Sequence, residues 1–148
     1  MKTALIAAAA LAAAPALADG DAVVSYTTDA GFEDVAFAVE QAIVGHGLVV
    51  DYVSHVGEML NRTGADVGSD VALFDAANVY LFCSAALSRK VMEADPMNIG
   101  HCPYGVFVAA AEGMDGPTVV GYRRYPEGAM QEVQALLDEI AREGAGLD

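Results

Sequence analysis

Apolar residues recur along the chain in blocks, some spaced as in strands and others as in helices. Runs rich in Val, Tyr and Phe, bounded by glycine or turn residues, predict strands at 22–27, 48–54, 79–82, 104–110 and 118–125. Apolar positions about three to four residues apart predict helices at 32–44, 84–94 and 127–142. A short helix is expected at 56–60, whereas residues 61–70 contain two glycines and show little periodicity.

The order of these elements indicates the fold class. The last two strands follow each other through a turn-rich connector, 111–117, which predicts a hairpin. The second strand is expected to run back beside the first. Because strands and helices do not alternate strictly, the pattern predicts an α+β two-layer sandwich, with helices packed on one face of a largely antiparallel sheet. The sequence contains no internal repeat and no long linker, so residues 19–148 are expected to form a single domain.

The first eighteen residues have the three parts of a secretory signal peptide. Lys2 precedes an apolar run, and the segment ends in Pro15-Ala16-Leu17-Ala18. A transmembrane helix needs roughly 20 apolar residues, and this run is shorter and interrupted by proline. We therefore expect cleavage after Ala18, a bacterial periplasmic or secreted protein, and no integral membrane segment after cleavage.

The charge of the chain excludes some partners. It has 21 acidic and 7 basic residues and a net charge of −14, and removal of residues 1–18 would take away Lys2 and no acid. So acidic a surface disfavours nucleic acids and anionic lipids, since binding to phosphate groups requires Lys and Arg. The acids are spread along the chain, which is typical of a solvated surface.

Two cysteines provide the clearest candidate chemistry. Cys83 ends a predicted buried strand, directly before the predicted helix N-cap Ser84, and Cys102 lies between His101 and Pro103. In an exported protein with no third cysteine, a disulfide is the first structural interpretation. Closing a loop of about 20 residues would stabilise the fold by roughly 3 kcal/mol on the chain-entropy model.

Other chemistry remains open for the same pair. A helix N-terminus favours a thiolate and would lower the pKa of Cys83, as in a redox pair, although the sequence has no Cys-x-x-Cys. Alternatively Cys83, His101 and Cys102 could converge on a soft metal such as copper(I) or zinc, or on haem, with Met92 and Met97 as further candidate ligands.

Enzyme motifs are scarce. The sequence has no Gly-x-Ser-x-Gly and no phosphate-binding loop, which favours a non-enzymatic domain. Arg123 and Arg124 form an adjacent basic pair at the end of a predicted strand, where alternation directs them to opposite faces. One can pair with an acidic side chain and the other can meet a ligand anion, and Arg123 is kept as a candidate binding residue.

Several segments carry a resemblance to a known family: 32–34 (FED), 78–85 (NVYLFCSA), 87–96 (LSRKVMEADP) and 99–104 (IGHCPY). With these residues the chain resembles the domain of unknown function 302 family, roughly from Asp29 to Ile140. The resemblance implies a compact two-layer α+β domain, often dimeric, with no established activity. It also implies that Cys83 and Cys102 correspond to the paired cysteines of that family.

The sequence therefore favours one function and keeps a second. The first is a ligand- or partner-binding module centred on Cys83, Ser84, His101 and Cys102, with Arg123 as a further binding residue. Its partner would be a small ligand or a periplasmic protein, and a homodimer is expected from the resemblance. The alternative is a protein that handles thiol redox chemistry, soft metals or haem through the same cysteines, and no particular cofactor follows from the sequence.

Overall fold

The computed structural model describes residues 22–111 and 117–147. Along the chain the described elements are β1 (Val23–Thr28), α1 (Phe32–Gly45), β2 (Val50–Ser54), α2 (Val56–Thr63), η1 (Ala65–Val67), β3 (Phe74–Phe82), α3 (Ala85–Ala94), η2 (Pro96–His101), β4 (Tyr104–Ala111), β5 (Thr118–Arg123) and α4 (Met130–Gly144).

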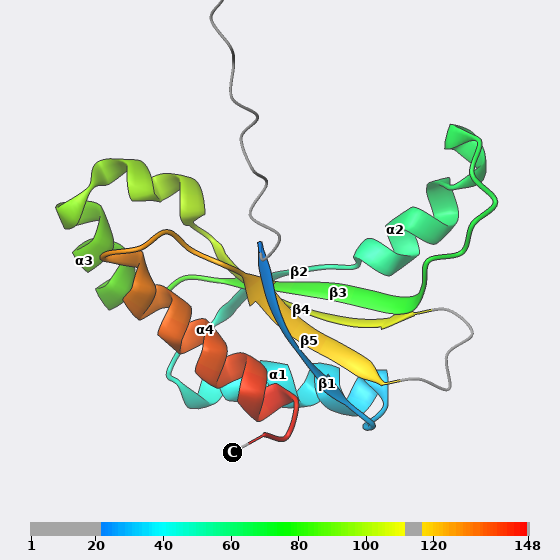
Figure 1. The fold of residues 1–148 in the computed structure, drawn as a ribbon, viewed down its shortest axis with the longest axis horizontal. Helices are drawn as coiled ribbons and strands as arrows, with labels where there is room; N and C mark the ends of the chain where they lie inside the picture. The colour runs from blue at the N-terminus through cyan, green and yellow to red at the C-terminus, as the bar shows by residue number, and fades with distance from the viewer. Residues whose placement is uncertain (1–21, 112–116, 148) are drawn as a thin grey trace, which may run out of the picture.

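The strands form one antiparallel sheet in the order β1-β5-β4-β3-β2, shown in Figure 1. The predicted α+β class, the antiparallel sheet and the β4–β5 pairing are confirmed. The expectation that the second strand lies beside the first is wrong, because β1 pairs with β5 and β2 pairs with β3. Helix α1 carries the chain from one edge of the sheet to the other, which places these two strands at opposite edges.

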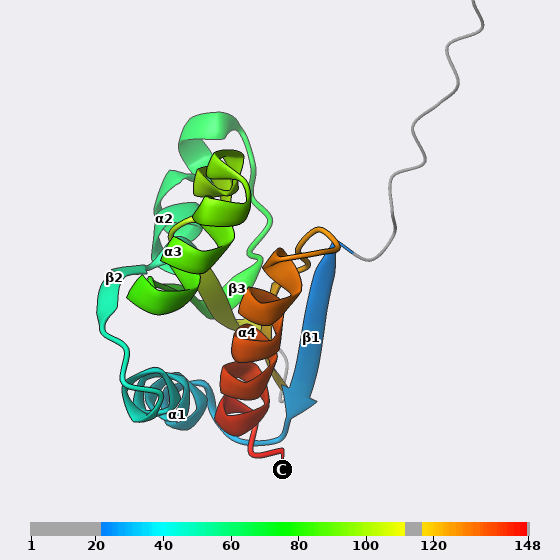
Figure 2. The same cartoon turned by 90° about the vertical axis from the view of Figure 1, so that its left-hand side faces the viewer.

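The hydrophobic core lies between one face of the sheet and helices α1 and α4, which lie side by side (Figure 2). Alternate residues of the central strands point into it, as a period of two requires. The fully buried large side chains are Ile43, Met130, Leu137, Ile140, Phe82 and Tyr104, with valines at 35, 39, 91, 106, 108 and 120. The helices therefore cover one face of the sheet, as predicted.

A carboxylate on α4 ties the helix layer to two strands at one edge of the sheet. Asp138 accepts hydrogen bonds from the hydroxyl groups of Tyr26 on β1 and Tyr122 on β5, the latter at 2.7 Å. Arg142 lies over the ring of Tyr26, 5.6 Å from its centroid. The hydrogen bond to Asp138 raises the pKa of Tyr26, and burial followed by the same carboxylate raises the pKa of Tyr122.

The start of β3, the start of α4 and the end of α2 differ from the predicted boundaries. Strand β3 begins at Phe74, five residues before the apolar run, because the polar and alanine-rich segment 74–78 pairs with β4. Helix α4 begins at Met130 rather than at residue 127, after Gly128 with a positive φ of 97°. Helix α2 extends to Thr63, into the segment that lacked periodicity.

Two predicted features fall on residues outside the described ones: the signal peptide at 1–18 and most of the connector between the last two strands. Within residues 22–111 and 117–147, none of the helices has both the length and the apolar character needed to cross a membrane.

The close approach of α1 and α4 requires a glycine. A Cβ atom at Gly144 would lie 2.3 Å from Cγ2 of Val39, which is fully buried. We predict that Gly144→Ala lowers the free energy of unfolding by about 1–3 kcal/mol, because the added methyl group overpacks this contact. Urea unfolding followed by circular dichroism measures the change.

Gly45 is the matched control, since it lies in the last turn of α1 and a Cβ there would meet nothing within 4 Å. Gly45→Ala should leave the free energy of unfolding unchanged or raise it by less than about 1 kcal/mol. Equal effects of the two substitutions would contradict the packing argument.

Candidate functional site

The in-register pairing of β3 with β4 brings the two cysteines together. Phe82 and Tyr104 face each other across this pair, so the chain leaves β3 toward Cys83 where it enters β4 from Cys102. The Sγ atoms of Cys83 and Cys102 lie 2.8 Å apart, and both residues are half-buried. The thiols are therefore in direct contact, and the Cys102–Pro103 peptide bond beside them is cis.

Helix α3 begins at the site and covers part of it. The side chain of Ser84 accepts a hydrogen bond from the backbone N–H of Leu87 at 3.3 Å, which makes Ser84 the N-cap as predicted. One turn later, Ser88 Oγ lies 2.9 Å from the Tyr104 hydroxyl and 4.0 Å from Cys102 Sγ. A serine and a tyrosine hydroxyl thus lie next to the sulfur pair.

The Cys83 thiol is less acidic than its place before a helix suggests. Burial raises its pKa to about 11, and the neighbouring Cys102 and the charge of Asp51 act in the same direction. The expectation of a lowered pKa is therefore wrong. Ser84, not Cys83, occupies the N-cap and accepts the helix N–H, while desolvation disfavours the thiolate.

His101 faces an aromatic side chain. Its ring packs edge-on against Tyr125, with centroids 5.4 Å apart, and Tyr125 also meets the ring of Tyr104 at 6.3 Å. Burial raises the pKa of Tyr125 to about 12, although the charge of Arg123 opposes part of the rise. Tyr125 therefore connects the surroundings of the cysteines with those of Arg123.

The two methionines among the candidate metal ligands differ in their exposure to solvent. Met92 is half-buried against the core, whereas Met97 on η2 is 76% exposed. In the part of the chain that the structure describes, no three His, Cys, Asp or Glu side chains are grouped so that they could hold a metal ion. The geometry thus brings together Cys83 and Cys102 from the candidate set.

Arg123 lies at a separate hollow of about 350 Å³. Its lining includes Pro103 and Tyr125, the first joined to Cys102 in sequence and the second in contact with His101. Neither cysteine lines it. The predicted binding residues therefore form two adjacent groups. One is the sulfur pair with Ser84, and the other is Arg123 at the hollow with His101 behind its lining residue Tyr125.

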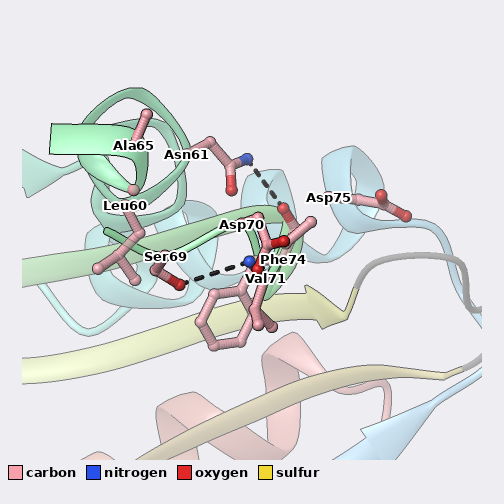
Figure 3. Close-up of a pocket in the computed structure, with 10 residues that line it drawn as sticks. Leu60, Asn61, Ala65, Ser69, Asp70, Val71, Phe74 and Asp75 are labelled. Atoms are coloured by element: carbon pink, nitrogen blue, oxygen red, sulfur yellow. Dashed lines mark hydrogen bonds between the residues drawn. The ribbon is translucent and has the colours of Figure 1, made fainter. Parts of the chain in front are cut away.

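A second hollow, of about 410 Å³, lies between α2, η1 and the segment that leads into β3 (Figure 3). Asn61 Nδ2 donates a hydrogen bond to the backbone carbonyl of Phe74 at 3.0 Å, and the Val71 N–H approaches Ser69 Oγ at 3.4 Å. Its polar side chains include carboxylates and no cysteine or histidine. It stands apart from the predicted site.

Sequence reasoning missed three side chains of this region. The sequence pattern places Ser88 in a helix, Tyr104 in a strand and Tyr125 at the end of a strand, and none of the three is among the predicted binding residues. Ser88 follows the predicted N-cap Ser84 by four residues, so helical spacing places both on one side of α3. Tyr125 lies at the end of the second strand of the predicted hairpin, so that pairing places it near Tyr104 at the start of the first strand.

Comparisons with known proteins agree with this fold. The family model described as "Domain of unknown function DUF302" matches residues 24–145. A crystal structure of an uncharacterized conserved protein DUF302 from Bacillus stearothermophilus is similar, with a TM-score of 0.59 and 16% sequence identity over 85% of this chain and 94% of that chain. No curated protein matches the sequence. Because the family model covers most of the chain, this protein belongs to the DUF302 family of domains of unknown function.

Proposed function

We propose that the protein is an exported, periplasmic binding domain whose binding region includes the Cys83–Cys102 pair, and that this pair closes as a disulfide. The contact between the two sulfur atoms at 2.8 Å carries the proposal. A bond between them would join the β3–α3 turn to the start of β4. It would also fix the position of Pro103, which follows Cys102 and lines the hollow at Arg123.

The surroundings of the pair suit a structural disulfide better than a reactive thiol. The raised pKa of Cys83 keeps it protonated at neutral pH, and a protonated thiol is a poor nucleophile. An oxidising compartment outside the cytoplasm, which the expected signal peptide implies, would keep such a pair oxidised. The resulting domain presents a fixed surface to a small ligand or a protein partner.

Thiol–disulfide exchange is a second candidate, favoured by the same sulfur contact and by the partial exposure of both cysteines. In that reaction the thiolate of one cysteine attacks a partner's disulfide, and the second cysteine then displaces the partner. The protein dithiol is oxidised to a disulfide, while the partner's disulfide is reduced to two thiols that take up the two protons. Soft-metal or haem binding would require both thiols to remain reduced.

The oxidation state of the purified protein tests the proposal. We predict that protein purified without reductant resists alkylation by iodoacetamide, and that both cysteines react after reduction and unfolding. Intact mass spectrometry counts the added groups, and elemental analysis of the same sample measures bound metal. Rapid alkylation of both thiols without reductant would contradict a disulfide, and about one equivalent of copper or zinc would favour the alternative.

The raised pKa of Cys83 predicts a pH dependence in the reduced protein. Its alkylation in the folded state should be slow at about pH 8, and the rate should keep rising toward about pH 11, because the thiolate forms only there. The stability of the reduced form should fall as the pH rises from 9.0 toward about 11, since the unfolded thiol ionises first.

The alkylation rate in guanidinium chloride provides the control, because the unfolded thiol should titrate near its ordinary pKa of 9.0. In the disulfide-bonded protein the free energy of unfolding should not show the fall between pH 9.0 and about 11, because Cys83 then has no thiol to ionise. A folded-state rate that levels off near neutral pH would contradict the assigned environment of Cys83.

A homodimer is also part of the proposal. The edge strand β2 presents Tyr52, which is 63% exposed, and Val49 just before it is 72% exposed. We predict that light scattering coupled to size-exclusion chromatography gives the mass of two chains, and that Tyr52→Glu shifts the protein toward one chain by placing a charge in the interface. A monomer in the unmodified protein would contradict the homodimer.

A further inference from the structure

The face of the sheet opposite α1 and α4 contains the hollow at Arg123. Figures 1 and 2 show α1 and α4 together on one side of the sheet, whereas on the other face α2 packs over β3 around Ala77. The apolar side chains of Val79 and Phe107 remain half-exposed on that face, and both line the hollow. They provide an apolar floor.

Glycines on the neighbouring strands shape this floor. Gly121 on β5 faces Phe107 on β4, and a Cβ atom at Gly121 would lie 2.6 Å from Cζ of Phe107. The aromatic ring therefore lies across β5 at a position where no other residue would fit. Gly105, directly opposite Leu81, also lines the hollow and adds no side chain to fill it.

Arg123 provides the only charge among the described residues that line the hollow. It is exposed and pairs in the sheet with Val23, so its neighbour across the β1–β5 ladder is apolar. The ion pairs found within residues 22–111 and 117–147 do not include it. None of the carboxylates in this part of the chain forms an ion pair with its guanidinium, which lies at an apolar hollow.

The occupant follows from charge complementarity and size. In a chain of net charge −14, an exposed arginine beside an apolar hollow attracts an anion, while an acidic surface repels one elsewhere. The volume of about 350 Å³ lies at the lower end of the range of about 300–1,000 Å³ for small-molecule sites. A planar guanidinium binds a carboxylate through two parallel hydrogen bonds.

We infer that this hollow binds a small carboxylate with an apolar or aromatic body, the carboxylate on Arg123 and the body against Phe107 and Val79. The inference names the ligand class for the binding domain proposed above and rests on that proposed function. Tyr125 closes one side of the hollow and connects it to His101. The ligand would therefore lie beside the segment that begins at Cys102 without contacting either sulfur.

Phenylacetate and its uncharged analogue phenylacetamide are suitable probes. The titrations use the whole chain after removal of the expected signal peptide and are followed by amide NMR. Phenylacetate should shift the amide resonances of residues on β4 and β5 around Phe107 and Arg123. Phenylacetamide should bind at least about tenfold more weakly, because it lacks the charge. Added salt should weaken the binding of phenylacetate and leave that of phenylacetamide unchanged.

Arg123→Gln should raise the dissociation constant of phenylacetate about tenfold and leave that of phenylacetamide unchanged, with Arg123→Lys between the two. Arg89→Gln is the control, since Arg89 is exposed on α3, pairs with Glu93 at 2.7 Å and lies outside the hollow. It makes the same change in net charge and should leave both constants unchanged.

The inference is overturned if phenylacetate causes no saturable shifts at about 10 mM, well above a weak dissociation constant of about 1 mM. Shifts at other residues, or equal effects of Arg123→Gln and Arg89→Gln, would also overturn it. The alkylation experiment tests the disulfide separately. If both thiols are free and phenylacetate still binds through Arg123, this site is supported and only the proposed role of the cysteines is contradicted.

Discussion

The burial of one sheet face beneath α1 and α4 is the constraint on which the rest of the structure depends. Alternate residues of β4 and β5, such as Val106, Val108 and Val120, are fully buried against the helices. Because strand side chains alternate, the same strands must present their other residues to the opposite face. The apolar Phe107, between Val106 and Val108, is thereby placed on the face away from α1 and α4 and becomes part of a hollow.

The candidate site depends on the same sheet through the register of β3 and β4. Since Phe82 faces Tyr104, the cysteines that flank these two residues, at 83 and 102, meet at one end of the pair. Helix α3 then starts directly above them, and its Ser88 reaches the Tyr104 hydroxyl. Burial by these elements disfavours the Cys83 thiolate, which supports the disulfide proposed for this pair over rapid thiol exchange.

The sequence predicted what depends on local periodicity. The fold class, the antiparallel sheet, the β4–β5 pairing and the N-cap at Ser84 follow from apolar spacing and turn residues, and the structure confirms them. The partner of β1 could not be predicted, because strand pairing across the chain leaves no local signal. The start of β3 at Phe74 was missed since its pairing with β4, not its composition, makes 74–78 a strand.

For the site, the sequence identified Cys83 and Cys102, which the structure brings into contact, but it did not predict their environment. A thiol before a helix suggested a low pKa, whereas burial beside Cys102 raises it, and burial depends on tertiary packing. The contact of His101 with Tyr125 is consistent with the predicted hairpin, which brings the start of β4 beside the end of β5. Arg123 was identified from its charge and its place at a strand end, and only the structure placed it at an apolar hollow.

The pairing of β1 with β5 also limits the order in which the domain can fold. Val23 at the start of β1 lies opposite Arg123 at the end of β5, and α4, which follows β5, supplies the carboxylate that holds both strands. Contacts between such distant parts of a chain carry a large loop-closure entropy and slow folding. Strand β1 therefore has no partner strand until residues 118–123, near the end of the chain, have been synthesised.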